Sequence, residues 1–333
     1  MPTIQEVAEK AGVSPTTVSH VINKSRVVAD ETRQRVEAAM EELHYRPNAL
    51  ARSLRRGQTH TLGLILPDSA NPFFAEIGHS IEAAAFDQGY SVVLCNTEGD
   101  LDKEELYVDV LTKKQVDGII FVAAGEQSDS LRTLLHHQLP VVVVDRDLAD
   151  AEIDAVLTDN RQGGYLATQH LIRLGHRRIG CIAGPSHLTP SAQRVTGYRE
   201  ALNEAGLPID DALIMRGDFH PQSGYHAARS LLERPTAPTA LFACNDLMAL
   251  GALRAAAEAG RSVPGQFAIV GFDDIELASF TSPPLTTIAQ PKSDLGRLAV
   301  GWLIEHIADK TRPARRELLP TRLIVRGTCG GQA

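Results

Sequence analysis

The chain opens with a stretch in which apolar residues recur at the spacing of one face of a helix. Those positions are Ile4, Val7, Ala8 and Ala11. Thr3 precedes the stretch and Glu6 follows three residues later, which is the pattern of a capping box at a helix N-terminus. The pattern therefore predicts a short helix with one buried face.

A second and a third helix follow. Gly12 favours a sharp turn, and Ser14 followed by Pro15 is typical of an N-cap with proline at the first helical position. The second helix would bury Val18, Val21 and Ile22, and a third, from Asp30 to a point before Pro47, would bury Val36, Ala39, Met40 and Leu43. Two helices joined by a glycine-containing turn predict a helix-turn-helix, whose second helix enters the major groove of DNA.

The opposite face of the second helix carries short polar side chains. They are Thr16, Thr17, Ser19, His20 and Asn23. Such groups can reach base edges and phosphates without long flexible stems. An ordinary helical hairpin is the alternative, because motifs of this kind also match by chance.

Residues 48–57 are basic and favour a helix. Arg52, Arg55 and Arg56 occur here without an acidic residue. Helices shorter than roughly 12 residues are marginal in water, so we expect this segment to become ordered with a partner, for which DNA is the natural choice. Leu54 beside these arginines fits an apolar wedge in the minor groove. A basic interdomain linker is the alternative.

From Thr61 onward, short apolar runs alternate with helical stretches. The first series of runs is 62–66, 91–94, 118–122 and 141–144, and the second is 178–183, 212–216, 240–243 and 268–271. Runs that are almost entirely apolar indicate strands of a parallel sheet covered on both faces. The alternation predicts an α/β fold with two doubly wound lobes, in which ligands bind beyond the carboxyl ends of the strands.

Polar and aromatic side chains follow these strands. They are Asn71, Phe73 and Phe74 after the first strand, Asp145 and Arg146 after the fourth, Arg194, Phe219, Asn245 and Asp273 after strands of the second series, and Gln290 at a predicted crossover. Carboxylates, arginines and amides bind hydroxyl groups, and aromatic rings pack on the C–H face of a sugar. The set predicts a sugar-binding cleft. Plainer interpretations are helix N-caps for Asn245 and Asp246, and core positions for Phe73 and Phe74.

The distribution of charge along the chain says more about DNA binding than the total charge does. The 333 residues carry a net charge of −8. The first 60 residues hold nine Lys and Arg against seven Asp and Glu, a net +2, whereas the remainder holds 24 against 34, a net −10. We therefore expect DNA to attract only the head and the basic segment, with an affinity that falls steeply as salt increases.

Other classes of function have little support in the sequence. No apolar run approaches the roughly 18 residues of a membrane span, and the four cysteines lack the paired spacing of a zinc site or redox dithiol. The run 184–187 only partly matches a serine-nucleophile elbow, and the histidines show no metal-ligand spacing. We expect a cytoplasmic protein with no catalysis, cofactor or metal. A sugar-binding protein without DNA function, or a hydrolase, is the alternative outside transcription.

Two blocks of the head resemble a known family. Residues 4–23 and the run Tyr45-Arg46-Pro47-Asn48-Ala49-Leu50-Ala51-Arg52-Ser53-Leu54 are similar to the lactose-repressor (LacI/GalR) family of bacterial transcription regulators. Within that family, the runs 91–100 and 271–280 resemble those of ribose-operon and purine repressors. The resemblance implies DNA contacts for Thr16, Thr17, His20 and Arg26, with Leu54 as the hinge wedge. The basic segment adds Arg52 and Arg55 as expected DNA contacts. Pro15 stands where relatives often carry a hydroxyl residue.

The resemblance also implies a domain plan. It gives a helix-turn-helix DNA-binding domain at 1–46, a hinge helix or linker at 47–60, and a ligand-binding and dimerisation domain of the periplasmic-binding-protein type at 61–333. Lobe one would comprise 61–158 and 291–320, and lobe two 159–290 and 321–333, with crossings near Thr158, Gln290 and Thr321. A homodimer on a near-palindromic double-stranded operator would follow.

The effector is suggested in the same way. The ten cleft residues match the pattern of bacterial ribose-binding proteins, so D-ribose is the expected ligand, acting as an inducer that releases the operator. Purine repressors address the base with an Arg and a Thr, and the aligned positions here are Leu188 and Pro190, which cannot donate a side-chain hydrogen bond. A purine or nucleoside, another sugar and a sugar acid are the alternatives.

Overall fold

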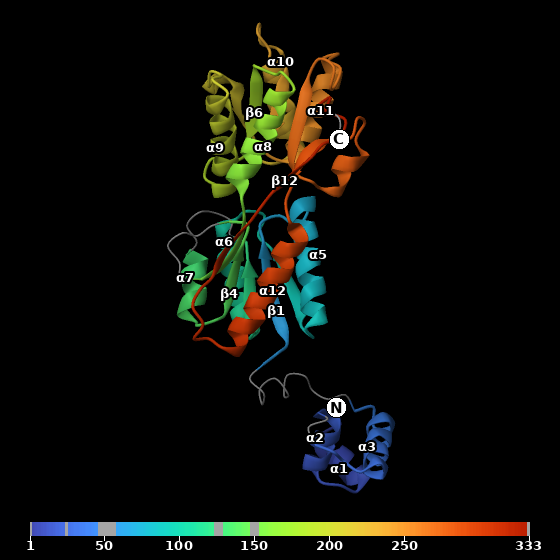
Figure 1. The fold of residues 1–333 in the computed structure, drawn as a ribbon. Coiled ribbons are helices and arrows are strands. Elements are labelled where there is room, and N and C mark those ends of the chain that lie inside the picture. Colours follow the sequence, from blue (N-terminus) through green and yellow to red (C-terminus); the bar gives the residue numbers. More distant parts are fainter. Residues whose placement is uncertain (1, 24–25, 46–57, 123–128, 147–152, 332–333) are drawn as a thin grey trace. The chain divides into compact units, whose positions relative to one another are not determined.

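The structure is a computed structural model that describes residues 2–23, 26–45, 58–122, 129–146 and 153–331. The chain divides into two compact units, Met1–Thr59 and His60–Ala333, both drawn in Figure 1. Within the described ranges, no helix combines the length and apolar character needed to cross a membrane.

The first unit folds into the helices α1 (Ile4–Ala11), α2 (Pro15–Asn23) and α3 (Asp30–Glu42). Both hydrogen bonds of the capping box between Thr3 and Glu6 are present, and Gly12 ends α1 in the left-handed conformation at φ 64°. The buried core consists of Val7, Ala8, Ala11, Val18, Val36 and Ala39. The three predicted helices and the turn at Gly12 are therefore confirmed.

Side chains fix the turn between α1 and α2. Ser14 Oγ accepts a hydrogen bond from the backbone N–H of Thr17 at 3.1 Å, so Ser14 caps α2 as predicted. Arg35 of α3 donates through Nε and Nη2 to the carbonyl of Ala11, at 3.1 and 2.5 Å. The third helix thus holds the other two in their helix-turn-helix arrangement.

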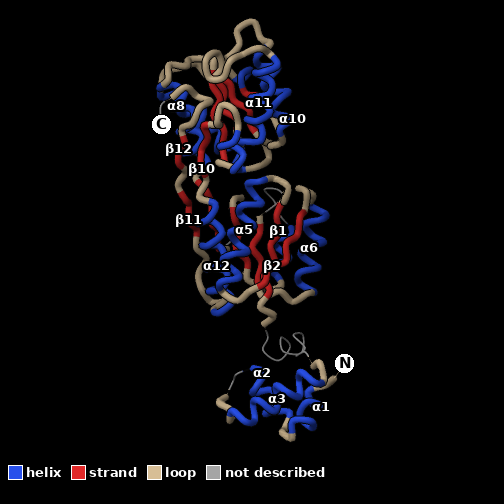
Figure 2. The backbone as a smooth tube through the Cα atoms, turned by 90° about the vertical axis from the view of Figure 1, so that its right-hand side faces the viewer, coloured by secondary structure: helices blue, strands red, loops and turns tan. Residues whose placement is uncertain are grey.

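The second unit contains two sheets, each with helices on both faces (Figures 1 and 2). The first sheet has the strand order β11-β5-β4-β3-β1-β2, with parallel neighbours throughout. Its strands are β1 (Thr61–Leu66), β2 (Ser91–Asn96), β3 (Gly118–Phe121), β4 (Val141–Val144), β5 (Asp154–Thr158) and β11 (Arg316–Leu319). Its helices are α5 (Pro72–Asp87) beside α12 (Lys292–Ala308), and α6 (Leu101–Lys113) beside α7 (Asp129–His136). We call this half lobe one.

The second sheet, in lobe two, has the order β12-β10-β9-β8-β6-β7. Its strands are β6 (Ile179–Ala183), β7 (Ile214–Arg216), β8 (Ala240–Ala243), β9 (Ala268–Asp273), β10 (Thr286–Ala289) and the antiparallel β12 (Arg322–Ile324). Helix α8 (Asn160–Arg173) packs on α9 (Thr189–Glu204), and α10 (Pro221–Leu232) on α11 (Asp246–Glu258). Short 3₁₀ turns are η1 (Asp211–Leu213) and η2 (Glu276–Phe280). The predicted α/β class with two doubly wound lobes is confirmed.

The chain passes from one sheet to the other after β5, after β10 and between β11 and β12. The apolar pattern did not predict these four strands, because each mixes polar and apolar residues. The strand expected at 212–216 begins only at Ile214, since the preceding residues form η1. β2 lies at a sheet edge with Leu94 49% exposed, so its run of apolar residues does not mean burial on both faces.

Helices α8 and α9 approach each other through glycines. A Cβ atom on Gly164 would lie 2.1 Å from the carbonyl oxygen of Arg194, and one on Gly197 would lie 2.0 Å from the carbonyl oxygen of Arg161. Because neither glycine has a side chain, α9 lies directly against α8. This contact fixes the position of Arg194 on α9.

We expect Gly197→Ala to lower the free energy of unfolding by about 1–3 kcal/mol, because the methyl group overlaps the backbone of α8. Urea unfolding would measure the change. The control is Gly301→Ala within α12, where an added Cβ meets no described atom within 4 Å. That change should raise the free energy of unfolding by about 0.5–1 kcal/mol through helix propensity. A Gly197→Ala protein as stable as the wild type would contradict the close contact.

Candidate functional site

Residues from both lobes meet around one small cavity. Nine of the ten cleft residues predicted from the sequence line it, together with two others: Asn71, Phe73, Phe74, Asp145, Arg146, Leu188, Pro190, Arg194, Phe219, Asn245 and Asp273. They follow the carboxyl ends of strands in both sheets, which is where ligands bind in open α/β folds. The fold therefore brings together side chains that are up to 202 positions apart in the sequence.

Lobe one contributes an aromatic wall of the cavity, formed by Phe73 and Phe74. Asn71 caps α5 by accepting a hydrogen bond at Oδ1 from the N–H of Phe73, at 3.0 Å. The rings of Phe73 and Phe74 have their centroids 5.1 Å apart and are tilted by 60°. The guanidinium of Arg146 lies 5.9 Å from the centroid of the Phe74 ring. Both phenylalanines also belong to the main core cluster, so the two interpretations of these residues are compatible.

Arg194 is the centre of the polar network in lobe two. Its Nε donates to Asn160 Oδ1 at 2.8 Å, and its Nη1 donates to the carbonyl of Cys244 at 2.5 Å. Nη1 also lies 3.5 Å from Oδ1 of Asp273, and the guanidinium stacks 3.8 Å from the centroid of the Phe272 ring. The side chain is 4% exposed. A buried guanidinium held on several sides is a rigid donor for a polar ligand.

Asp273 pairs with Arg194 and accepts a hydrogen bond at Oδ1 from Gln290 Nε2, at 2.7 Å. Burial raises the pKa of this carboxyl to about 7, against the opposing effects of Arg194, Gln290 and Lys292. Asp273 can therefore change protonation near neutral pH. Its backbone has φ 113°, a conformation that costs energy for a residue with a side chain.

Asp145 faces Arg194 from lobe one. Burial raises the pKa of this carboxyl, and the positive charges of Arg146 and Arg194 partly oppose the shift. Burial lowers the pKa of Arg146, while Asp145 and Glu104 oppose that change. Within the described part of the chain, Asp145 Oδ1 has no hydrogen-bond partner although it is buried. A buried acceptor of this kind is suited to a hydroxyl donor supplied by a ligand.

Asn245 and Phe219 are held together. Asn245 Oδ1 accepts from the N–H of Met248 at 2.9 Å and caps α11, while its Nδ2 donates to the carbonyl of Phe219 at 2.9 Å. The N-cap interpretation of Asn245 is thus correct, and the residue still lines the cavity. A Cβ atom on Gly184 would lie 2.1 Å from the Phe219 ring, so glycine is required there.

Asp145 and Phe219 share with Asp273 a positive φ, at 67° and 70°. Backbone strain of this kind persists where the surroundings over-determine it and is concentrated at binding sites. Three such residues around one cavity therefore point to a site built for a ligand.

The space between these side chains is about 30 Å³. A water molecule needs roughly 10–15 Å³ measured in this way, so the cavity has room for about two waters. A sugar would fit only after the two lobes, or the side chains between them, have moved apart.

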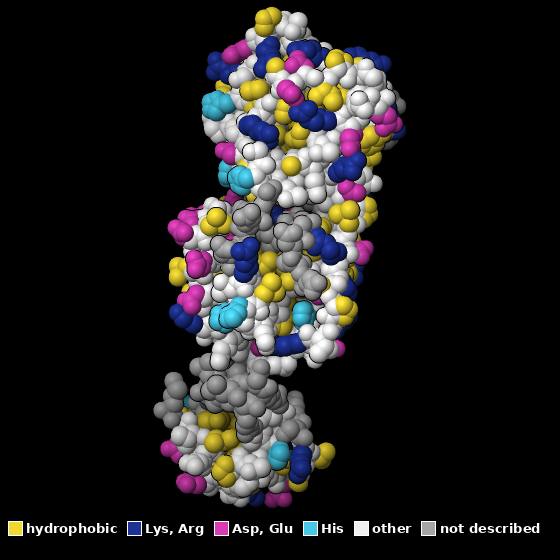
Figure 3. All heavy atoms as spheres, turned by 90° about the vertical axis from the view of Figure 1, so that its left-hand side faces the viewer, with side chains coloured by type: hydrophobic (Ala, Val, Ile, Leu, Met, Phe, Trp, Pro, Cys, Tyr) yellow, Lys and Arg dark blue, Asp and Glu magenta, His cyan; other side chains and the backbone are white. Residues whose placement is uncertain are grey.

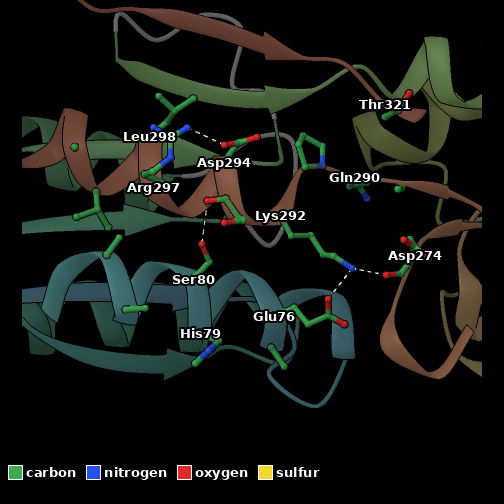
Figure 4. Close-up of a pocket in the computed structure, with 18 of the residues that line it drawn as sticks. Glu76, His79, Ser80, Asp274, Gln290, Lys292, Asp294, Arg297, Leu298 and Thr321 are labelled. Atoms are coloured by element: carbon green, nitrogen blue, oxygen red, sulfur yellow. Dashed lines mark hydrogen bonds and ion pairs between the residues drawn. The ribbon is translucent and has the colours of Figure 1, made fainter. Parts of the chain in front are cut away.

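Gln290 does not line this cavity. It supports Asp273 from outside and also borders a larger groove of about 1600 Å³ between α5 and α12 (Figure 4). None of the other nine predicted cleft residues lines that groove. Two residues that the sequence pattern did not single out also support the cavity: Asn160 positions Arg194, and Lys292 bonds to the backbone of Asp273. Neither residue could be identified from the sequence pattern, since each acts through a residue that is distant in the sequence.

The candidate DNA-contacting residues of the head are partly described. Thr16 and Arg26 are exposed, and Thr17 and His20 are partly exposed on α2. The Thr17 hydroxyl lies 3.0 Å from the Ser14 hydroxyl and so also belongs to the cap of α2. The remaining predicted contacts lie outside the described residues: Arg52, Leu54 and Arg55. On the face of the second unit shown in Figure 3, acidic and basic side chains are interspersed.

The head and the second unit match two descriptions of one family. Residues 3–48 match bacterial regulatory proteins of the lacI family. Residues 59–326 match the periplasmic binding proteins and sugar binding domain of the LacI family.

Two curated relatives are similar over nearly the whole chain. The ribose operon repressor of Escherichia coli strain K12 is 45% identical over 329 residues, which is 98% of this chain and 100% of that protein. The HTH-type transcriptional repressor PurR of Pasteurella multocida strain Pm70 is 45% identical over 327 residues, which is 98% of each.

Two solved structures have the same fold. The lac repressor dimer bound to operator and the anti-inducer ONPF has a TM-score of 0.89 and 31% identity, over 98% of this chain and 99% of that one. A LacI family transcriptional regulator from Enterococcus faecium with bound ribose has a TM-score of 0.74 and 33% identity, over 80% of this chain and 98% of that one. The chain therefore belongs to the LacI family of bacterial regulatory proteins and is a ligand-responsive, DNA-binding transcription repressor.

Proposed function

We propose that this repressor controls a sugar catabolic operon and that D-ribose is its inducer. The observation that carries the proposal is the donor and acceptor set of the cavity. Arg146 and Arg194 donate, Asp145 and Asp273 accept, and the phenylalanines offer ring faces. This composition suits vicinal hydroxyl groups on a small ring. The 45% identity to a ribose operon repressor, and the related structure with bound ribose, support it.

A purine or nucleoside effector is the second candidate, because PurR of Pasteurella multocida is equally identical to this chain. Leu188 and Pro190 line the cavity at the positions where purine repressors are expected to carry hydrogen-bonding side chains. A polar base would leave its own donors and acceptors unpaired against these two residues, which costs affinity. The cavity lining therefore favours the sugar.

The proposal also assigns operator contacts to the helix-turn-helix and to the basic segment after it. We propose that Thr16, Thr17, His20 and Arg26 contact operator DNA, and that the segment 47–60 forms a hinge with Arg52 and Arg55 on phosphates and Leu54 as a wedge. In this proposal the head is 1–46 and the ligand-binding and dimerisation domain is 61–333. Two copies of the chain would bind the two half-sites of a near-palindromic operator in the bacterial cytoplasm.

Ribose would act by changing the relation of the two lobes. Binding at residues from both lobes favours the lobe arrangement that fits the sugar, and a dimer would transmit this change to its two hinges. The available energy is the difference in ribose affinity between the two states, typically about 1–3 kcal/mol. We propose that this difference releases the operator and that the cleft performs no catalysis.

Isothermal titration of the purified full-length protein with D-ribose tests the proposal. We expect saturable binding of one ribose per chain and, in a parallel gel-shift experiment, weaker operator binding with ribose present. Hypoxanthine, guanine, other pentoses and hexoses serve as controls. Heat from hypoxanthine or guanine with none from ribose would replace the sugar by a purine effector.

A further inference from the structure

A lysine of lobe one bonds to the lobe-two turn that carries Asp273 and also forms an ion pair within its own lobe. Lys292, at the start of α12, lies with Nζ 2.6 Å from Oε2 of Glu76 on α5. The same Nζ donates to the backbone carbonyl of Asp274 at 2.6 Å (Figure 4) and to that of Asp273 at 3.1 Å. Lys292 and Glu76 belong to lobe one, whereas Asp273 ends β9 in lobe two and Asp274 follows it. One ammonium group therefore binds both lobes.

The second oxygen of Glu76 strengthens this bridge. Glu76 Oε1 accepts a hydrogen bond from the N–H of Glu276, at 3.3 Å, in the segment just after the turn. On the other side of the turn, Arg326 Nη2 donates to Asp274 Oδ1 at 2.7 Å. The turn is thus held from lobe one by Glu76 and Lys292 and from within lobe two by Arg326.

The turn needs such support because its backbone is strained. Asp273 and Asp274 have φ values of 113° and 53°. Residues in these conformations relax unless neighbouring groups hold them in place. Relaxation at Asp273 would rotate its carboxylate away from Arg194, which lies 3.5 Å away.

Glu76 lies on α5, the same helix that carries the cavity-lining Phe73 and Phe74. Phe73 lies three positions before Glu76 on α5, which is about one helical turn. The pair of Lys292 and Glu76 therefore connects the two walls of the cavity from outside it: the strained turn with Asp273 on one side and the start of α5 on the other. Lys292 is 14% exposed at its side chain, so water screens its bonds less than those of a fully exposed ion pair.

We propose that Lys292 and Glu76 are positioning residues of the ligand site. They hold the carboxylate of Asp273 in the orientation that a sugar hydroxyl meets, and they tie that orientation to the position of α5. Neither residue lines the cavity. The inference rests on the proposed sugar-binding function, and it adds two residues that act on affinity without touching the ligand.

The test compares Lys292→Met with Arg297→Met in the full-length protein. Arg297 lies one to two turns further along α12, and its Nη2 pairs with Asp294 at 2.7 Å on an exposed surface, so its loss removes a charge without touching the turn. We expect Lys292→Met to weaken ribose binding about tenfold or more, the range for losing hydrogen bonds to a charged group. Arg297→Met should bind ribose as the wild type does, and both variants should bind operator normally without ribose.

A second variant and a second readout separate positioning from a general loss of stability. Lys292→Arg keeps the charge and donors, and we expect ribose affinity within about threefold of the wild type. Without any ligand, peptide-level hydrogen exchange over residues 271–280 should become at least about fivefold faster in Lys292→Met and stay unchanged in Arg297→Met.

The outcomes are distinct for the two proposals. Unchanged exchange and unchanged ribose affinity in Lys292→Met would overturn the positioning role while leaving the ribose proposal intact. A wild-type protein that does not bind ribose would overturn the proposed effector, and the exchange measurement would still decide whether Lys292 holds the turn. Equal loss of exchange protection throughout the second unit would also count against a local positioning role.

Discussion

Arg194→Met should abolish measurable ribose binding, with a loss of affinity of at least about 100-fold. The variant removes the donor that faces Asp273 and the bonds to Asn160 and the carbonyl of Cys244. Breaking a buried charge pair typically costs about 3–5 kcal/mol because the remaining partner is left uncompensated. We therefore expect a lower free energy of unfolding as well, measured by urea unfolding beside calorimetric titration with ribose.

A matched control lies on the same helix. Arg199 of α9 pairs with Asp211 at 2.5 Å, but their side chains are 41% and 78% exposed. Arg199→Met should leave ribose affinity unchanged and shift the free energy of unfolding by no more than about 1 kcal/mol. Arg194→Lys keeps a charge in case Arg194→Met fails to fold, yet it lacks the planar set of donors and should still bind ribose poorly. Ribose binding by Arg194→Met within tenfold of the wild type would contradict the cavity as the effector site.

Ribose affinity should fall about tenfold between pH 8 and pH 6. Burial raises the pKa of Asp273 to about 7, so the carboxylate that accepts a ligand hydroxyl is mostly ionised at pH 8 and mostly protonated at pH 6. The charged groups that act on it are Arg194, Lys292 and Asp145. Calorimetric titration with ribose over this range, in buffers of equal ionic strength, measures the effect.

Asp273→Asn isolates the contribution of this group. The variant should bind ribose about tenfold more weakly than the wild type at pH 8, because the neutral amide resembles the protonated acid in charge, and most of the pH dependence should disappear. The same pH slope in the variant and the wild type would show that another group is responsible.

The pH dependence of folding stability runs in the opposite direction to that of ribose affinity. The folded protein keeps the Asp273 proton up to about pH 7, whereas an unfolded Asp releases it near its ordinary value of 3.8. The contribution of this group to stability is therefore fully present below pH 3.8 and is lost as the pH rises through 7. Burial shifts the pKa of Asp145 in the same direction. The ligand-free cleft is thus made less stable by the same ionised carboxylates that a sugar would need.

Much of the candidate site could be predicted because each residue has a fixed place relative to a strand. A residue that follows a parallel strand lies at the carboxyl edge of the sheet whatever the details of packing. For this reason Asn71, Asp145 and Asp273 could be assigned to one cleft before any distance was known. Gln290 was placed less accurately, since its role depends on the path of the chain between the lobes.

The partners of these residues could not be predicted in this way. Arg194 donates most of its hydrogen bonds to acceptors within the protein. The bond from Lys292 to the carbonyl of Asp273 joins helix α12 to a turn on the other lobe. Nothing in the local pattern around Lys292 or Glu76 indicates either contact. Such bonds depend on how two sheets are oriented, and orientation results from the packing of many side chains together.

The sequence by itself determined the helix-turn-helix, most strands of the two lobes and the residues around the cavity, because helical and strand periodicity, caps and turns act over a few residues. Only the tertiary structure decided the burial that raises the pKa of Asp273, the strained turn that carries this residue, and the small volume of the cavity, about 30 Å³. Burial and strain depend on distant parts of the chain meeting in space, and no local pattern encodes them.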